Sequence, residues 1–274
     1  MRGAAALVLM LVLMLQLAGC ASPPHGGFAW AAMGDTPYTE GEVRRLDLLI
    51  DELNKEQVAF VLHVGDIGSS LTACDDAWLM ARKRQLARIK HKLLVVPGDN
   101  EWIDCKDPQA RLAAWRRLFC EAPFDLERQA GEFCEHRRWV AGGYLFVTLN
   151  VQGSNNNVRN AAEHRHRMAA VYSWLEESAA LAQKGRVGLI IVMQANPFIV
   201  LPRDGYGGLR ERLIRLGTEM SGQVMLVHGD THTYHDDEPI PGMRRLEVWG
   251  SPIVSYIRGE VEDGVLRFTL PRIR

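Results

Sequence analysis

Residues 93–102 read Leu-Leu-Val-Val-Pro-Gly-Asp-Asn-Glu-Trp, an apolar, strand-like run that ends abruptly in three polar side chains able to bind a metal. The same arrangement, an apolar run ending in Gly-Asp, recurs at Phe28–Asp35, Val58–Asp66 and Gln223–Asp230. A single Gly-Asp pair after a strand is most often a turn or a helix cap. Four such pairs after four similar runs predict one shared site at the ends of the strands.

Helical patterns separate these strands. Thr39 followed by Glu42 is a capping-box pattern, and apolar residues recur at helical spacing over 40–54. A second helix is expected around 75–90. This β-α-β-α-β order predicts an α/β fold with a partly parallel sheet, in which ligands bind beyond the carboxyl ends of the strands. The other predicted elements are strands at 144–149 and 187–193, helices opening at Pro108 and Ala161 and near 207–218, and a hairpin over 254–270 around Asp263-Gly264.

The amino terminus has the pattern of an export signal. Arg2, the apolar run Ala4–Leu17 and the sequence Leu-Ala-Gly-Cys ending at Cys20 predict a lipoprotein signal peptide over residues 1–19. A transmembrane anchor is disfavoured, because about 14 apolar residues fall short of the roughly 20 that span a bilayer. We expect a lipidated Cys20, a tether over 20–27 and a single domain over 28–274. The expected location is the periplasmic side of the bacterial cell envelope, and the lack of an acidic residue after Cys20 favours the outer membrane.

Charge gives no reason to expect a nucleic-acid partner, because the formal net charge is −1. The densest basic run, Arg82–Lys92, carries Leu86 and Ile89 at helical spacing and is interpreted as a solvated helix face. A monomer is the expected state.

Besides Cys20, the chain has four cysteines, and an even number in an exported protein favours two disulfides. Spacing alone leaves three connectivities open. A zinc site is disfavoured because the chain has no C-x-x-C pair. The four are Cys74, Cys105, Cys120 and Cys134.

The carboxylates at the strand ends predict a metal centre. Carboxylates gathered in one place repel one another unless a cation lies among them. His232, two residues after Asp230, adds an imidazole, whereas His63 and His235 are expected outside the ligand set. Two divalent ions about 4 Å apart would polarise a phosphoryl group and activate a water for attack.

The order of these motifs resembles the calcineurin-like metallophosphoesterases, which carry D-x-H, G-D, G-N-H-[DE], a strand-end His and G-H-x-H in sequence. The matching segments are Asp35–Pro37, Gly65-Asp66, Gly98–Glu101, Gln194 and Gly229–His232. The resemblance extends over about residues 28–235. It implies a four-layer α-β-β-α sandwich of two mixed sheets and a dinuclear metal site that hydrolyses phosphate esters.

The chain departs from the family pattern at several ligand positions. Pro37 replaces the first His, Asp99 replaces Asn, Gln194 replaces the strand-end His, and Asp230 replaces the first His of the last motif. An oxygen-rich set favours Mg²⁺, Mn²⁺ or Ca²⁺ over Zn²⁺ or iron, with one or two ions bound. Tyr38 is an alternative phenolate ligand, as in the purple acid phosphatase branch, although its motif position differs. The predicted metal ligands are Asp35, Asp66, Asp99, Gln194, Asp230 and His232.

The third motif also changes the expected chemistry. Asn100 stands where the family has the His that protonates the leaving group. As a catalytic residue, its amide is expected to donate a hydrogen bond to a phosphoryl oxygen, but it cannot deliver a proton near neutral pH. His228 or His232 is predicted to supply that proton, unless the substrate has a good leaving group. Glu101 is expected to orient Asn100 or to act as an acid, and a purely structural hydrogen bond is the alternative.

Two loops complete the prediction. Cys74 follows the Asp66 loop and Cys105 follows the Asp99 loop, so we predict a Cys74–Cys105 disulfide, with Cys120–Cys134 as the second. The polar loop at 153–157 is expected to reach over the site, with Asn155 and Asn156 contacting substrate, and a solvated loop is the alternative.

The sequence therefore favours a metal-dependent phosphoesterase acting on a small phosphate ester, monoester or diester. The other hypothesis is a weakly active or inactive metal-binding lipoprotein with an interaction role in the envelope.

Overall fold

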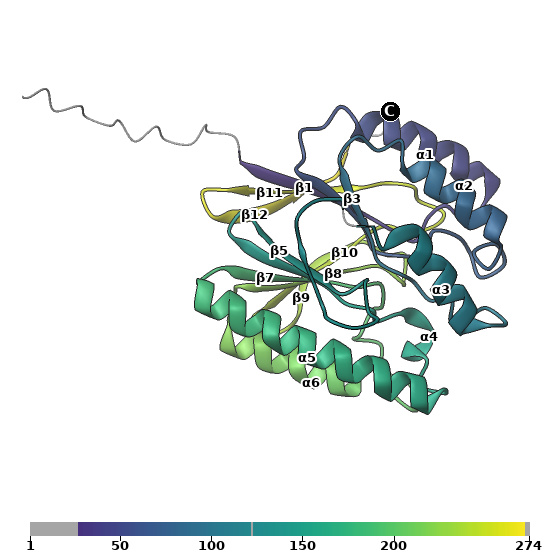
Figure 1. Cartoon of the computed structure of the whole chain (residues 1–274). Coiled ribbons are helices and arrows are strands. Elements are labelled where there is room, and N and C mark those ends of the chain that lie inside the picture. Colours follow the sequence, from purple (N-terminus) through teal and green to yellow (C-terminus); the bar gives the residue numbers. More distant parts are fainter. Residues whose placement is uncertain (1–26, 122, 272–274) are drawn as a thin grey trace, which may run out of the picture.

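The computed structural model describes residues 27–121 and 123–271 (Figure 1). The predicted signal peptide, Cys20 and most of the tether lie outside the described residues. Among the described residues, no helix is long and apolar enough to cross a membrane.

Two mixed β-sheets form the centre of the molecule. The first has five strands in the order β12-β11-β1-β2-β3, and β1, β2 and β3 run parallel to one another. The second has seven strands in the order β4-β5-β6-β7-β8-β10-β9, with a parallel set formed by β6, β7, β8 and β10. The strands of the first sheet are β1 (Phe28–Met33), β2 (Phe60–His63), β3 (Lys92–Val95), β11 (Ile257–Glu262) and β12 (Val265–Thr269). Those of the second are β4 (Glu127–Arg128), β5 (Arg137–Ala141), β6 (Tyr144–Thr148), β7 (Gly188–Val192), β8 (Val224–His228), β9 (His235–Ile240) and β10 (Met243–Glu247).

Helices cover the outer face of each sheet, so the molecule has four layers (Figure 1). The first sheet is covered by α1 (Glu40–Leu53), α2 (Asp76–Leu86) and α3 (Pro108–Phe119). The second sheet is covered by α5 (Ala161–Gly185) and α6 (Gly207–Glu219). A single turn, α4 (Gly153–Asn156), lies at the end of the molecule where β1 finishes.

Three apolar clusters hold these layers together. One lies between the sheets and includes Trp30, Phe60 and Phe146, and the other two lie under the helices. The sequence of β7 shows why that strand is central: Leu189 and Ile191 face the helical cluster, while Ile190 and Val192 face the other sheet. A strand buried on both faces reads as a continuous apolar run. The four-layer α-β-β-α prediction is therefore confirmed.

Most predicted elements are present, with some differences in their limits. Thr39 caps α1, and its hydroxyl accepts a hydrogen bond from the Glu42 backbone N–H. The second helix ends at Leu86, four residues before the predicted limit. The hairpin around Asp263-Gly264 is formed by β11 and β12.

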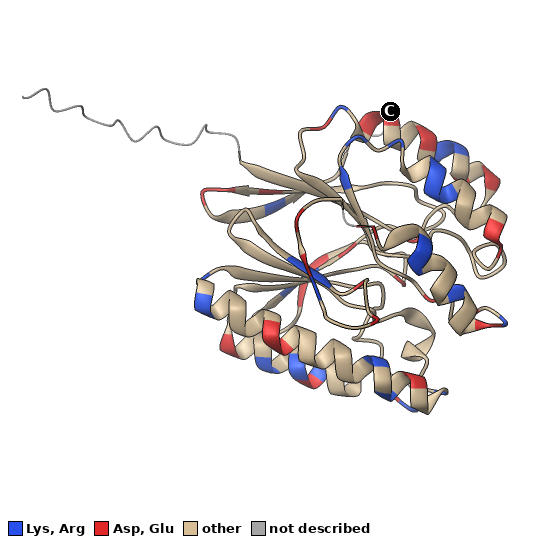
Figure 2. Cartoon of the chain, in the orientation of Figure 1, with Lys and Arg blue, Asp and Glu red and all other residues tan. Residues whose placement is uncertain are grey.

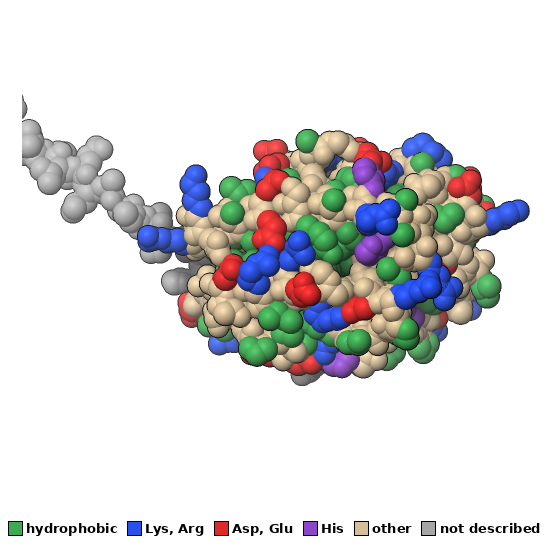
Figure 3. Space-filling model, turned by 90° about the horizontal axis from the view of Figure 1, so that it is seen from below, with side chains coloured by type: hydrophobic (Ala, Val, Ile, Leu, Met, Phe, Trp, Pro, Cys, Tyr) green, Lys and Arg blue, Asp and Glu red, His purple; other side chains and the backbone are tan. Residues whose placement is uncertain are grey.

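The outer surface of the helical layer formed by α5 and α6 carries mixed charge (Figure 3). On the face seen from below, positive and negative side chains alternate with apolar ones, and no extended basic surface appears there (Figure 3).

Candidate metal and catalytic site

The four Gly-Asp segments meet at one edge of the sandwich. They follow β1, β2, β3 and β8, whose carboxyl ends lie at the edge where the two sheets come together. The Asp35 backbone N–H donates to Gly65 O at 2.9 Å, and the Asp230 N–H donates to Asp35 Oδ1 at 2.9 Å. The second of these hydrogen bonds joins the two sheets, so the predicted convergence of the strand ends occurs. In Figure 2, acidic segments are visible on the strand-end loops between the two layers of helices.

Glycines make room for these carboxylates. A Cβ on Gly98 would overlap the Asp66 carboxylate, and one on Gly229 would overlap Asp35 Oδ2. A Cβ on Gly153 would overlap Asp230 Oδ1 and lie 2.8 Å from Asp99 Oδ1. Each carboxylate is thus held against bare backbone, and the glycine before each Asp has a packing role as well as a turn role.

Asp66 is the centre of the hydrogen-bond network. Its Oδ2 accepts from the Tyr38 hydroxyl at 2.8 Å, from Asn100 Nδ2 at 3.0 Å and from Gln194 Nε2 at 3.3 Å. Its Oδ1 accepts from the Asn100 backbone N–H at 3.2 Å. Tyr38, the alternative ligand of the sequence analysis, therefore lies inside the site.

His232 presents a lone pair to the site. Its Nδ1 lies 2.8 Å from the Ser251 carbonyl oxygen, which can only accept, so Nδ1 carries the proton. Nε2 then faces Tyr38 Oη at 3.3 Å and Asp35 Oδ1 at 3.9 Å. Metal-binding histidines are commonly oriented by such a bond from the other ring nitrogen.

The carboxylates are buried without positive partners. Within residues 27–121 and 123–271, no Lys or Arg nitrogen comes within 4.0 Å of Asp35, Asp66, Asp99, Glu101 or Asp230. Burial, with repulsion from neighbouring carboxylates, raises the pKa of Asp35 and Asp66 well above the usual range. Burial also raises the pKa of Asp99 and Glu101 to about 7 and that of Asp230 to about 6. A bound cation would lower all these pKa values.

The residues present fit a divalent cation. Asp35 Oδ2 and Asp99 Oδ1 are buried and have no hydrogen-bond partner. Such atoms in a glycine-lined cluster of acids are suited to a hard cation. No three Asp, Glu, His or Cys donors of this cluster lie within 4.8 Å of one another among the described residues, because Tyr38, Asn100 and Gln194 lie between them. A cation beside Asp66 would therefore replace the hydrogen bond from Tyr38.

The structure corrects the predicted catalytic roles of His228 and Glu101. His228 is fully buried at the end of β8, its Nδ1 lies 2.9 Å from Gly229 O, and burial lowers its pKa to about 3. It stays neutral and contacts Glu247 rather than the four aspartates. Glu101 accepts hydrogen bonds from the backbone N–H groups of Gly98, Ile67 and Asp66, so it positions the strand-end loops. The structural alternative for Glu101 is the one observed.

Asn100 is inside the site, but its amide is fully engaged. Nδ2 lies 3.0 Å from Tyr38 Oη, 3.0 Å from Asp66 Oδ2 and 3.0 Å from Gly68 O. Two hydrogens are shared among three acceptors, which leaves none for a phosphoryl oxygen in this arrangement. Asn100 therefore acts as a positioning residue for Asp66.

The predicted substrate contact of Asn156 is also corrected, whereas Asn155 lines a pocket beside the site and its substrate contact stays a prediction. The Asn156 side chain is fully buried and bonds to Gly205 O and Arg167. The Asn155 amide bonds to Arg203 O and to the Gly205 N–H. Both amides join the 153–157 loop to the loop before α6, where they have structural roles.

The loop at 153–157 does reach the site, through Ser154 and Gly153. Ser154 Oγ lies 2.9 Å from Asp99 Oδ2 and 2.6 Å from Asp104 Oδ1, and the Gly153 N–H donates to Gln194 Oε1 at 2.6 Å. Residues 154–157 all have positive φ, which makes α4 a left-handed turn. The run Ser-Asn-Asn-Asn was the available signal, because Asn adopts this conformation more readily than most residues.

A pocket of about 740 Å³ lies beside the acidic cluster. It is lined by Asp104 and Ser154, which contact Asp99 or each other, and by residues of the 153–159 and 201–203 loops. Arg159 and Arg203 supply positive charge to its wall.

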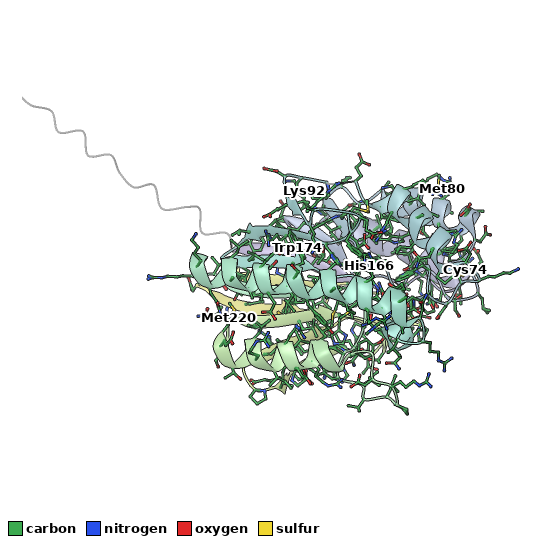
Figure 4. All side chains as sticks on the ribbon, turned by 60° about the horizontal axis from the view of Figure 1, so that its bottom comes forward. Cys74, Met80, Lys92, His166, Trp174 and Met220 are labelled. Carbon is green, nitrogen blue, oxygen red and sulfur yellow. A yellow bond between two sulfur atoms is a disulfide. The ribbon has the colours of Figure 1, made fainter. Side chains whose placement is uncertain are left out.

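Both predicted disulfides are confirmed. Cys74–Cys105 and Cys120–Cys134 each have a Cα–Cα distance of 5.6 Å. Figure 4 places Cys74 at the right-hand end of the molecule, which is the end where β1 finishes in Figure 1.

This fold and this acidic site define a protein of the metallophosphoesterase type. A family model described as calcineurin-like phosphoesterase matches residues 28–234, and the chain belongs to that family. Its members use divalent metal ions in general. No curated protein gives a significant match.

Solved structures with the same fold are distant in sequence. A dimetal phosphatase from Danio rerio is 14% identical, with a TM-score of 0.62 and coverage of 89% of this chain and 96% of that chain. The purple acid phosphatase PPD1 from yellow lupin (Lupinus luteus) is 13% identical, with a TM-score of 0.58 and coverage of 89% and 52%. GAP50, the anchor in the inner membrane complex of Plasmodium, is 12% identical, with a TM-score of 0.57 and coverage of 89% and 84%. At these identities the likeness concerns the fold.

Proposed function

We propose that this protein is an enzyme of the cell envelope that hydrolyses a small phosphate ester with the help of a divalent cation. The observation that carries the proposal is the buried cluster of aspartates, which has no Lys or Arg partner within residues 27–121 and 123–271 and includes two unpartnered oxygens, on Asp35 and Asp99. Burying such a cluster is costly unless a cation neutralises it.

The residues of the site have three kinds of task in this proposal: holding the cation, donating a hydrogen bond, and positioning the loops. Asp35, Asp66 and His232 would hold the cation, which when bound polarises the phosphoryl group and lowers the pKa of a water molecule. Tyr38 remains protonated, because burial and the neighbouring carboxylates raise its pKa, and its hydroxyl lies between Asp66 and His232. Glu101 and Asn100 hold the loop of Asp66 and the loop of Gly98 together by hydrogen bonds.

The pocket beside the site supports an anionic substrate. Arg159 and Arg203 lie in its wall, and arginine is well suited to bind phosphate oxygens. With Asn100 in place of a proton donor, substrates whose leaving group departs without protonation are expected to react fastest. Aryl phosphates and phosphoanhydrides meet this condition.

A hydrolysis assay tests the proposal. Mature protein lacking residues 1–19 would be given aryl phosphomonoesters and phosphodiesters with Mg²⁺, Mn²⁺, Ca²⁺ or Zn²⁺. We expect turnover with at least one oxygen-preferring ion, and a loss of about 100-fold or more in Asp66→Asn. Equal turnover by wild type and Asp66→Asn, or none with any ion, would refute the enzymatic role.

The engaged amide of Asn100 favours a second candidate, a metal-binding envelope protein without turnover. A protein of similar fold, GAP50, is described as the anchor in the inner membrane complex of Plasmodium. Cation binding without hydrolysis of any ester in the panel above would select this candidate.

The envelope location remains part of the proposal and rests on the amino-terminal sequence. β1 begins at Phe28 and ends beside Asp35, so the site lies at the opposite end of this strand from the tether. A lipid on Cys20 would therefore leave the site facing away from the membrane. Cys20→Ser should move the protein from the membrane fraction to the soluble periplasmic fraction, and an unchanged membrane fraction would argue against lipid anchoring.

A further inference from the structure

We infer that the site holds one cation rather than two, because the amide of Gln194 occupies the place of the second. This inference rests on the proposed cation dependence and adds the number of ions. The site has two halves, defined by their contacts with Asp66. In the first, Tyr38 links Asp66 to His232, which lies near Asp35. In the second, Gln194 links Asp66 to Asp230, and Gly153 lies close to both Asp230 and Asp99.

Gln194 points its hydrogens, not its oxygen, at the carboxylates. The Gly153 backbone N–H donates to Oε1 at 2.6 Å, and a backbone N–H needs an acceptor, so this bond fixes which end of the amide is oxygen. Nε2 then lies 3.3 Å from Asp66 Oδ2 and 3.4 Å from Asp230 Oδ1. These are long hydrogen bonds, but they place positive hydrogens between the two carboxylates that a second cation would bridge.

The other donor atoms of this half are already engaged. Asp230 Oδ2 accepts from the Asn196 N–H at 3.2 Å, and Asp99 Oδ2 lies 2.9 Å from Ser154 Oγ, whose single hydrogen it shares with Asp104 Oδ1 at 2.6 Å. Only Asp99 Oδ1 has no partner there. One carboxylate oxygen is a weak ligand set for an ion that prefers six or more oxygens.

The neighbouring loop prevents the Gln194 amide from turning. Gly153 is followed by the left-handed turn of residues 154–157, and Asn156 fixes that turn through the buried Arg167 side chain. Gln194 itself is fully buried, with its Cγ close to Gly65. Turning the amide would leave the Gly153 N–H facing an N–H₂ group.

The first half contains a hydroxyl rather than a locked amide: Tyr38 O–H donates to Asp66 Oδ2 at 2.8 Å, and a cation would replace this single hydrogen bond. Asp35 Oδ2 is unpartnered, and the His232 Nε2 lone pair faces it across the Tyr38 hydroxyl. Three donors of different chemistry, carboxylate, imidazole and phenol, converge there beside Asp66. This half is therefore the one assigned to the cation.

Gln194→Glu tests the inference with a minimal change, because it replaces only the N–H₂ group by an oxygen. Mature wild-type protein and the variant would be loaded with Mn²⁺, separated from free metal, and measured for manganese per chain and for their electron paramagnetic resonance spectrum. Gln183→Glu, which adds the same charge at an exposed position of α5, is the matched control. Gln194→His, a neutral metal-binding replacement, is the second variant should the extra buried charge disturb folding.

We expect one Mn²⁺ per chain with a mononuclear spectrum in wild type and in Gln183→Glu. Gln194→Glu or Gln194→His should bind two, with a spectrum of coupled ions. Two ions in wild type would overturn the inference while leaving the proposed function intact. No ion in wild type would overturn both, and one ion in both Gln194 variants would show that the amide is not what excludes the second.

Discussion

Gly98 illustrates how closely single residues determine this site. A Cβ at this position would overlap the Asp66 carboxylate and backbone. Gly98→Ala should therefore destabilise the fold by about 1–3 kcal/mol and displace Asp66, with a marked loss of Mn²⁺ affinity. Gly185→Ala is the control, because its nearest neighbour would lie at 3.7 Å. Urea unfolding and Mn²⁺ titration measure both effects, and an unchanged affinity in Gly98→Ala would contradict the assigned position of Asp66.

Asn100 offers a gain-of-function test. Asn100→His restores a group that can donate a proton to a leaving group, and general acid catalysis contributes about 10²–10⁴-fold in typical enzymes. We expect a rise in kcat for alkyl phosphates, whose leaving groups need a proton, and little change for aryl phosphates with good leaving groups. Because both substrates meet the same protein, the ratio of their rates controls for any general damage. A ratio unchanged from wild type would contradict the account of Asn100.

At the level of single residues, the convergence of the four aspartates and the place of His232 beside them could be predicted, whereas the surroundings of His228 and Asn156 could not. Asp35, Asp66, Asp99 and Asp230 are marked by their place after strands, which strand direction alone brings together. The positions of His228, Asn155 and Asn156 depend on the side chains of Glu247 and Arg167 and on the backbone of Gly205, which are distant in sequence. No local pattern carries that information.

At the level of elements, the Cys74–Cys105 disulfide ties two strand-end loops together. Both sulfurs lie near the Asn100 carbonyl oxygen, at 3.9 and 3.5 Å. Replacing both cysteines by Ala should cost about 3–4 kcal/mol for a separation of 31 residues and should weaken Mn²⁺ binding.

The second disulfide supplies the comparison. Replacing Cys120 and Cys134 should cost about 3 kcal/mol for a separation of 14 residues and leave Mn²⁺ affinity unchanged. Urea unfolding and Mn²⁺ titration of the two double variants would show the contrast. Equal effects on affinity would mean that the first disulfide has no special role at the site.

Elements with strong apolar patterns could be predicted, and polar ones were missed. β7 is a continuous apolar run and was found, whereas β5 contains two arginines that are buried through partners elsewhere in the chain. β9 reads His-Asp-Asp-Glu-Pro-Ile, which has no strand periodicity, and it forms an edge of its sheet beside β10. The left-handed turn at 154–157 is stabilised by tertiary contacts and has no helical sequence signal.

At the level of the whole molecule, stability should depend on pH and metal together. The raised pKa values of Asp99 and Glu101, about 7, mean that the folded protein binds protons more tightly than the unfolded chain. Without metal, these two groups add to the free energy of unfolding at low pH, and this stabilisation is lost as pH rises from about 4 through 7. A cation replaces those protons, so it should stabilise the protein more at high pH.

Three buried histidines give the stability of the protein the opposite dependence on pH. Burial lowers the pKa of His63 and His136 to about 4 and that of His228 to about 3, so stability falls as pH drops below about 6.5. This contribution is the same with and without metal. The difference in melting temperature between Mn²⁺ and EDTA samples, measured between about pH 5 and pH 8, therefore isolates the acidic cluster. We expect the difference to grow with pH, and a constant or shrinking difference would contradict the assignment.

The most direct test of the acidic cluster is anomalous diffraction from crystals grown with Mn²⁺. The account predicts an anomalous peak in contact with Asp35, Asp66 and His232, and no peak between Asp99 and Asp230. An empty cluster, with the Tyr38 hydroxyl and the Asn100 amide still bonded to Asp66, would contradict it.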